Sequence, residues 1–145
     1  KQDNDMHRLM ALPLVLWLFV AGAATAQQAA EPRAWAERLL GLLIEAGPAA
    51  AHTLITRETL IAKRQPAAVK AMRQAMLKIE SVHGPAQAFE LVAEKPVANS
   101  VVLLTYLVRH DARPLVWEFD FYRRKQGWDL VSFRFKDNLA RLPRR

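Results

Sequence analysis

The spacing of apolar residues changes at Gly84-Pro85, and this change constrains the fold more than any other feature of the chain. Before it, apolar side chains recur every three or four residues, which indicates helices. After it they alternate with polar ones, which indicates strands. The alternating part contains four runs, which predict strands over residues 88–95, 100–109, 115–124 and 128–136.

Three amphipathic helices are expected before the strands. Pro32 and Pro66 each suit the first turn of a helix, and Gly47-Pro48 ends the helix that begins at Pro32. A second helix is expected from Pro48 to about Lys63. The third helix, from Pro66 to Gly84, carries an apolar stripe made of Val69, Met72, Met76 and Ile79.

The hairpin between the last two strands has a register that the sequence favours. A three-residue loop, Lys125-Gln126-Gly127, places glycine in the left-handed position of a common hairpin turn. A two-residue Gln-Gly loop would exchange the faces of the last strand. The three-residue loop predicts the pairs Arg124 with Trp128, Phe121 with Val131, Phe119 with Phe133, and Trp117 with Phe135.

A loop over residues 110–113 aligns the preceding pair of strands, with Tyr106 opposite Trp117 and Leu104 opposite Phe119. One sheet face then collects apolar side chains, which three helices need in order to bury their stripes. We therefore predict a single α+β domain over residues 27–145, with helices packed on a curved four-stranded antiparallel sheet. The predicted inner face comprises Val102, Leu104, Tyr106, Val108, Leu115, Trp117, Phe119, Phe121, Val131, Phe133 and Phe135.

The other face of this sheet is mixed. The same registers place Arg134 opposite Glu118, Ser132 near Asp120, and Tyr122 opposite Leu130. One interpretation is a polar patch that binds a ligand or performs acid–base chemistry, formed by Glu118, Asp120, Tyr122 and Arg134. The other is a cross-strand ion pair between Glu118 and Arg134, contributing about 0–1 kcal/mol. Apolar residues on the same face, such as Val101 and Leu103, leave covering by a partner or a second copy open.

The beginning of the chain has the layout of an export signal. Met6-His7-Arg8 precedes an apolar run over residues 9–20, and small residues follow up to Ala24-Thr25-Ala26. This pattern predicts a periplasmic or secreted protein, cleaved after Ala26, with an upstream extension before Met6. A retained anchor is the alternative, although the 16 apolar residues 9–24 are fewer than the ~20 that a span needs.

The sequence lacks the residues that several classes of functional site require. The chain has no cysteine and a net charge of +7, which removal of residues 1–26 leaves unchanged. The sequence contains no phosphate-binding loop, no G-x-S-x-G motif and no histidine pair at metal-binding spacing, so we expect no cofactor and no metal. Export also argues against a nucleic-acid partner. Positive charge is concentrated at a hairpin tip, formed by Arg123, Arg124 and Lys125, and in a C-terminal tail with Arg141, Arg144 and Arg145. These residues favour peripheral contact with anionic envelope lipids or glycans.

Residues 114–142 resemble the C-terminal strands of a known fold family. An aromatic strand with Trp117 and Phe119 precedes a Gly127-Trp128 turn, a strand with Phe133 and Phe135, and an Asp137-containing tail. This pattern is similar to that of exported bacterial proteins with the nuclear transport factor 2-like, or cystatin-like, cone fold. The resemblance implies the architecture but no single function, since such folds host enzymes, ligand binders and dimeric modules.

Three hypotheses follow for function. The first is a non-enzymatic exported cone-fold protein that binds a small apolar ligand or an envelope protein. The second is an isomerase- or hydrolase-type enzyme with acidic residues in the cone, although the catalytic groups of the family's isomerases do not map residue by residue onto this chain, so no catalytic role carries over. The third is a homodimeric module. The residues expected at a ligand or partner face are Tyr106, Trp117, Glu118, Asp120, Tyr122 and Arg134.

Overall fold

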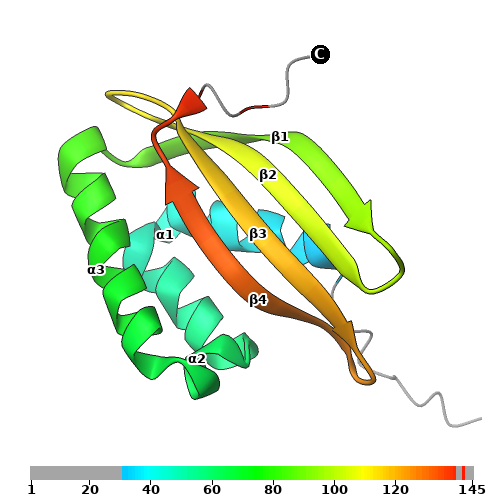
Figure 1. Ribbon diagram of the computed structural model, residues 1–145. Coiled ribbons are helices and arrows are strands. Elements are labelled where there is room, and N and C mark those ends of the chain that lie inside the picture. Colours follow the sequence, from blue (N-terminus) through cyan, green and yellow to red (C-terminus); the bar gives the residue numbers. More distant parts are fainter. Residues whose placement is uncertain (1–30, 140–141, 143–145) are drawn as a thin grey trace, which may run out of the picture.

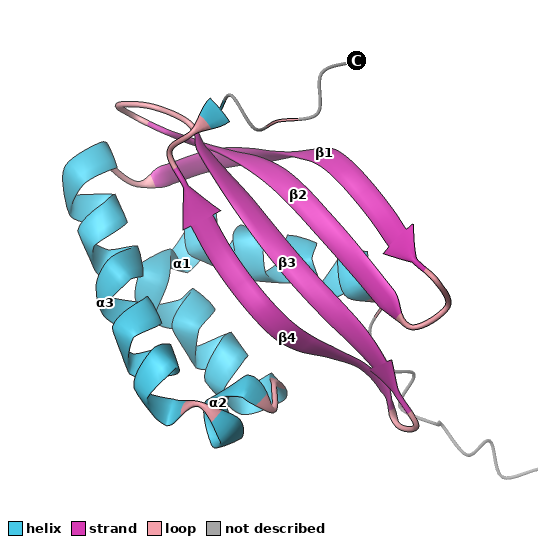
Figure 2. Cartoon of the chain, in the orientation of Figure 1, coloured by secondary structure: helices cyan, strands magenta, loops and turns pink. Residues whose placement is uncertain are grey.

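The computed structural model describes residues 31–139 and residue 142. The predicted signal sequence and the basic residues Arg141, Arg144 and Arg145 lie outside these residues. Helices come first and a four-stranded antiparallel open sheet follows, in the order β1-β2-β3-β4, so the predicted α+β class is confirmed (Figures 1 and 2). The elements are α1 (Pro32–Glu58), α2 (Ile61–Arg64), α3 (Pro66–His83), β1 (Ala86–Val97), β2 (Val101–His110), β3 (Leu115–Arg124) and β4 (Gly127–Lys136).

The first two predicted helices form one element, α1, that is interrupted at the expected place. Gly47 leaves the helical region with φ 79° and ψ −177°, and the helix resumes at Pro48. The prediction that this second segment reaches Lys63 is wrong, because Thr59 adopts an extended conformation. Thr59 is buried at this end of the helix, and its hydroxyl donates a hydrogen bond to the carbonyl of Ile55 at 2.7 Å. The short α2 follows.

The third helix, α3, has the predicted bounds and the predicted stripe. Val69 and Met76 are buried, while Met72 and Ile79 pack against the core at its edge. Gly84 ends the helix with φ 79°. Its carbonyl accepts a hydrogen bond from Nδ1 of His110 at 2.9 Å when that nitrogen carries the proton. His110 was expected in a loop, but it pairs with Ala86 as part of β2 and is buried.

The register between β2 and β3 is the predicted one, with Tyr106 opposite Trp117 and Leu104 opposite Phe119. The register between β3 and β4 is correct in one half only. Phe133 faces Phe119, but Gly127 already pairs with Arg124, and Phe121 faces Leu130 instead of Val131. The remaining predicted pair, Trp117 with Phe135, is confirmed, whereas Arg124 with Trp128 and Tyr122 with Leu130 are wrong.

A β-bulge at Val131 reconciles the two halves of β4. The pairing shifts by one residue between Asp120 and Phe121, so Val131 has no partner on β3. The extra residue returns the later part of the strand to the predicted register. As a result Leu130 is buried and Val131 is 38% exposed. The inner face therefore takes Leu130 in place of Val131.

The core lies between α1 and the inner face of the sheet. In Figure 1, α1 passes behind the sheet and α3 runs alongside β4. Tyr106, Trp117 and Phe119 have less than 2% of their surfaces exposed. Among the described helices, α1 alone is long and apolar enough to cross a membrane, judged by length and composition. Part of its apolar side chains, including Leu39, Leu40 and Ile55, is buried in the core cluster.

Candidate functional site

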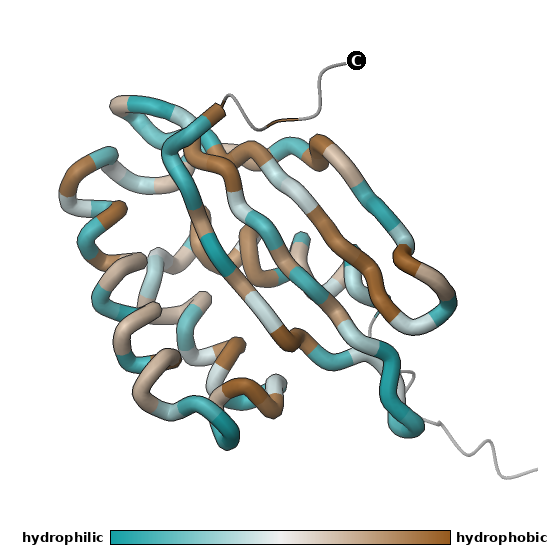
Figure 3. Tube along the Cα trace, in the orientation of Figure 1, coloured by the Kyte–Doolittle hydropathy of each residue, from teal (hydrophilic) through white to brown (hydrophobic). Residues whose placement is uncertain are grey.

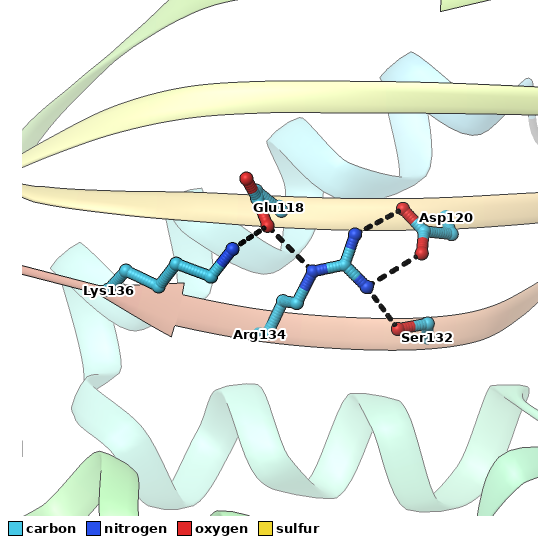
Figure 4. A network of polar contacts seen from close by, with 5 residues as sticks. All are labelled: Glu118, Asp120, Ser132, Arg134 and Lys136. Carbon is cyan, nitrogen blue, oxygen red and sulfur yellow. Dashed lines mark hydrogen bonds and ion pairs between the residues drawn. The ribbon is translucent and has the colours of Figure 1, made fainter. Parts of the chain in front are cut away.

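An ion-pair network occupies the outer face of the sheet, on β3 and β4 (Figure 4). Arg134 donates from Nε to Glu118 at 2.6 Å and from Nη1 to Asp120 at 2.9 Å. Nη1 also donates to the Ser132 hydroxyl at 2.9 Å, and Nη2 to the other Asp120 oxygen at 3.3 Å. Lys136 donates to Glu118 at 2.9 Å. The cross-strand arrangement of Glu118, Asp120, Ser132 and Arg134 is as predicted.

The network stabilises Glu118 in its ionised form. Partial burial by itself would raise the pKa of the Glu118 carboxyl, but the hydrogen bonds from Lys136 and Arg134 outweigh it and hold this pKa below its usual range. Two carboxylates and two cations share the network, so its charges compensate one another. A carboxylate engaged in this way is a poor general base, because accepting a proton would disrupt its ion pairs.

The other three residues of the predicted face take no part in the network. Tyr122 lies near the β3–β4 turn, opposite Asp129, with its ring 5.7 Å from the guanidinium of Arg124. Tyr106 and Trp117 are buried on the inner face. The structure thus unites Glu118, Asp120 and Arg134, leaves Tyr122 on the same outer face without a contact to them, and places Tyr106 and Trp117 on the inner face.

Tyr106 reaches the edge of the core with its hydroxyl group. Its Oη lies 3.5 Å from Oε1 of Glu37 on α1. Burial, followed by the nearby charge of Glu37, raises the pKa of the Tyr106 hydroxyl well above its usual value. Tyr106 therefore stays neutral, and its ring serves the core through edge-to-face contacts with Phe89 and Phe119.

Catalytic carboxylates are missing from the interior of the described part of the chain. The buried polar side chains there are Thr59 and His110. No group of three or more histidine, aspartate or glutamate side chains among the described residues is placed to hold a metal ion. The arrangement that an acidic cone enzyme needs, with carboxylates in an apolar cavity, is therefore not formed by Glu118 and Asp120, which lie on the outer face.

The basic tip is partly a structural clamp. Arg124 donates to Asp129 at 3.0 Å, and the other Asp129 oxygen accepts from the backbone N–H of Leu60 at 3.2 Å. These contacts tie the β3–β4 turn to the segment that precedes α2. Arg123 lies over the ring of Trp128, at 5.8 Å, and Lys125 is exposed. Figure 3 shows the β3–β4 turn in teal, the colour of hydrophilic residues.

A groove between α3 and β4 was not predicted from the sequence. It has a volume of about 410 Å³ and combines small residues of α3 with aromatic residues of β4. We call it the α3–β4 groove. Its apolar lining consists of Ile61, Ala68, Ala71, Met72, Ala75, Val131, Phe133 and Phe135, and its polar lining of Gln65, Ser132 and Arg134.

The groove exists because the facing side chains are short. Ala68, Ala71 and Ala75 recur on one side of α3, and none of them reaches across to β4. Phe133 and Phe135 are only half-buried, although they stack on the aromatic core. The alanine spacing was visible in the sequence. Its meaning depends on the placement of α3 beside an edge strand, which the sequence pattern does not show.

Comparison with known proteins gives no relative. No protein-family model, curated protein or solved structure matches the chain. The function is therefore inferred from the geometry of the described residues, and the likeness to the nuclear transport factor 2-like fold remains a prediction.

Proposed function

We propose that the protein is a non-enzymatic binding protein of the cell envelope, exported by its N-terminal signal and cleaved after Ala26. In this proposal the domain is a nuclear transport factor 2-like cone, and the α3–β4 groove binds an apolar ligand or an apolar segment of a partner protein. The helices-then-sheet order and the small residues before Gln27 support the architecture and the export.

The groove itself is the observation that carries this proposal. A volume of about 410 Å³ lies within the range of sites for small ligands. Its lining is mainly apolar, and Phe133 and Phe135 offer ring surface that the fold leaves half-exposed. The enzyme alternative has weaker support, because Glu118 and Asp120 are ion-paired on the outer face and not gathered in a cavity.

Native mass spectrometry of protein purified from its own envelope tests the proposal. We expect the wild-type protein to retain a bound molecule. Ala71→Trp fills the groove at an exposed position and should abolish retention, whereas Gln74→Trp, at an exposed position of α3 outside the groove lining, should not. A protein that carries no bound molecule, or that carries it equally well with Ala71→Trp, would contradict the proposal.

A further inference from the structure

Two further hollows flank the α3–β4 groove along β4 and share lining residues with it. A hollow of about 110 Å³ lies toward the β3–β4 turn, with Leu60, Ile61, Arg64 and Gln65 on one side and residues 129–131 on the other. Another of about 400 Å³ lies at the opposite end, between the C-terminal part of α3 and residues 135–138. Together the three hollows follow the strand from Asp129 to Asn138, which suits an elongated occupant more than a compact one.

The floor of this elongated groove is a strand edge. β4 is the last strand of the sheet, so its outer edge has no neighbouring strand among the described residues (Figure 2). Beyond the bulge at Val131, β4 pairs regularly with β3 from Ser132 to Lys136. A hydrocarbon ligand placed there would shield the edge N–H and C=O groups from water without pairing them. An extended peptide would pair them, as in recognition by strand addition.

The end of the groove near the β3–β4 turn carries positive charge. Arg64 and Arg124 line the hollow near the turn, beside the exposed Lys125. The one acidic side chain there, Asp129, is already paired with Arg124 at 3.0 Å. Arg64 has no ion-pair partner among the described residues. The turn end is therefore electropositive and complements an acidic segment.

We propose that the groove binds an extended segment of a partner protein that adds antiparallel to β4, with apolar side chains at alternate positions and acidic residues at its C-terminal end. This proposal rests on the function proposed above. β4 runs away from the turn, so an antiparallel segment ends near Arg64, where its acidic residues meet unpaired positive charge. The apolar side chains of the segment would lie against Phe133, Phe135 and the alanines of α3.

A displayed library of random 12-residue peptides tests the occupant. Selection on the full chain should enrich peptides that alternate apolar and polar residues and end in Asp or Glu. The Ala71→Trp variant should enrich none of them, while Gln74→Trp should enrich the same peptides as the wild type. Enriched peptides that bind Ala71→Trp equally well would overturn the proposal.

Charge and direction are tested with a synthetic peptide taken from the enriched set. Arg64→Glu should weaken its binding about fivefold or more at low salt, since it removes an attraction and adds a repulsion. Lys63→Glu changes the net charge equally but lies outside the groove lining, so it should change binding less than twofold. A peptide of reversed sequence should bind at least tenfold more weakly. Equal binding of the two directions would overturn the antiparallel arrangement.

Two further measurements separate this proposal from the function on which it rests. If no peptide is enriched but palmitate binds the wild type and not Ala71→Trp, the partner segment is wrong and the binding function stands. If neither peptide nor palmitate binds, both proposals fail. A dimer in sedimentation that Ala71→Trp dissolves would make a second copy of the chain the occupant, which also overturns the partner segment.

Discussion

Single residues decide how the outer face of the sheet behaves. Arg134 places donors toward Glu118, Asp120 and Ser132 at once, which a lysine at this position would not do, because its ammonium group lacks the planar fork. The residues were expected to lie together from the alternation of the strands alone. The ion pair of Glu118 with Arg134 was one of the two interpretations of the sequence. The further hydrogen bonds of Arg134 to Asp120 and Ser132, and that of Lys136 to Glu118, extend this pair into a compensated ionic network.

The network predicts that the free energy of unfolding depends on pH in the acidic range. The pKa of Glu118 is lower in the folded protein than in the unfolded chain, where it is about 4.3. The stabilisation is therefore fully present above this value and is lost as the pH falls through the folded pKa. Urea unfolding between about pH 5 and pH 3 should show that wild type loses more stability than Glu118→Gln, by up to about 1 kcal/mol because the pairs are partly exposed.

Glu45→Gln is the control for this measurement, because Glu45 is exposed on α1 and has no ion pair among the described residues. It should keep the wild-type dependence on pH. Equal slopes for wild type and Glu118→Gln would show that the network contributes nothing to stability.

Gly84 occupies a position where both the backbone conformation and the neighbouring side chain disfavour any larger residue. Its φ is +79°, and a Cβ added there would lie 2.5 Å from Oδ2 of Asp111. Gly84→Ala should therefore destabilise the fold by about 1–3 kcal/mol in urea unfolding. Gly41→Ala is the matched control, because its Cβ meets nothing within 4 Å and alanine favours a helix, so this change should stabilise by about 0.5–1 kcal/mol. A neutral Gly84→Ala would contradict the argument.

At the scale of elements, β4 depends on its bulge. The hairpin turn alone would put Leu130 opposite Phe121 and continue with the wrong residues facing inward. The unpaired Val131 restores Phe133 and Phe135 to the inner face. The expected aromatic matches were correct beyond the bulge because burial selects the face of each ring. The turn and the first residues of the strand differ because Arg124 pairs with Gly127, and the extra residue Val131 offsets this shorter connection.

Two single-residue deletions in β4 should have opposite outcomes. Deleting Val131 joins Leu130 directly to Ser132 and makes the two registers continuous, so the variant should fold with a near-regular hairpin. Deleting Arg134 turns either Phe133 or Phe135 to the outer face. The loss of one buried ring should lower the free energy of unfolding by about 1.5–3 kcal/mol. Urea unfolding with circular dichroism compares the two. A Val131 deletion as damaging as the Arg134 deletion would refute the role of the bulge.

For the whole molecule, one core joins the helices to the sheet. Trp35 of α1 contacts Phe121 of β3 edge to face at 5.7 Å, and the same cluster includes Met76 of α3 and Tyr106 of β2. The chain has no cysteine, so disulfides contribute nothing and this cluster holds the domain together. The network on the outer face lies outside this cluster, whereas the groove beside β4 borders it, because Ile61 belongs to the cluster and Phe133 and Phe135 pack against it.

The shared core predicts that the domain unfolds in one step. Far-ultraviolet circular dichroism follows the helices, and tryptophan fluorescence reports on Trp35 in α1, Trp117 in β3 and Trp128 in β4. Both signals should give the same midpoint in urea, as expected for a two-state domain. A separate early transition of the helices would show that α1 and the sheet do not share a single cooperative core.

The sequence by itself determined the α+β class, the bounds of α3, the order of the strands and the register of β2 with β3. These follow from alternation and from turn residues, which act over short distances. Only the tertiary structure decided the bulge at Val131 and the groove beside β4. Each of these depends on which face and which edge of the sheet the helices cover, and that is set by packing between segments distant in the chain.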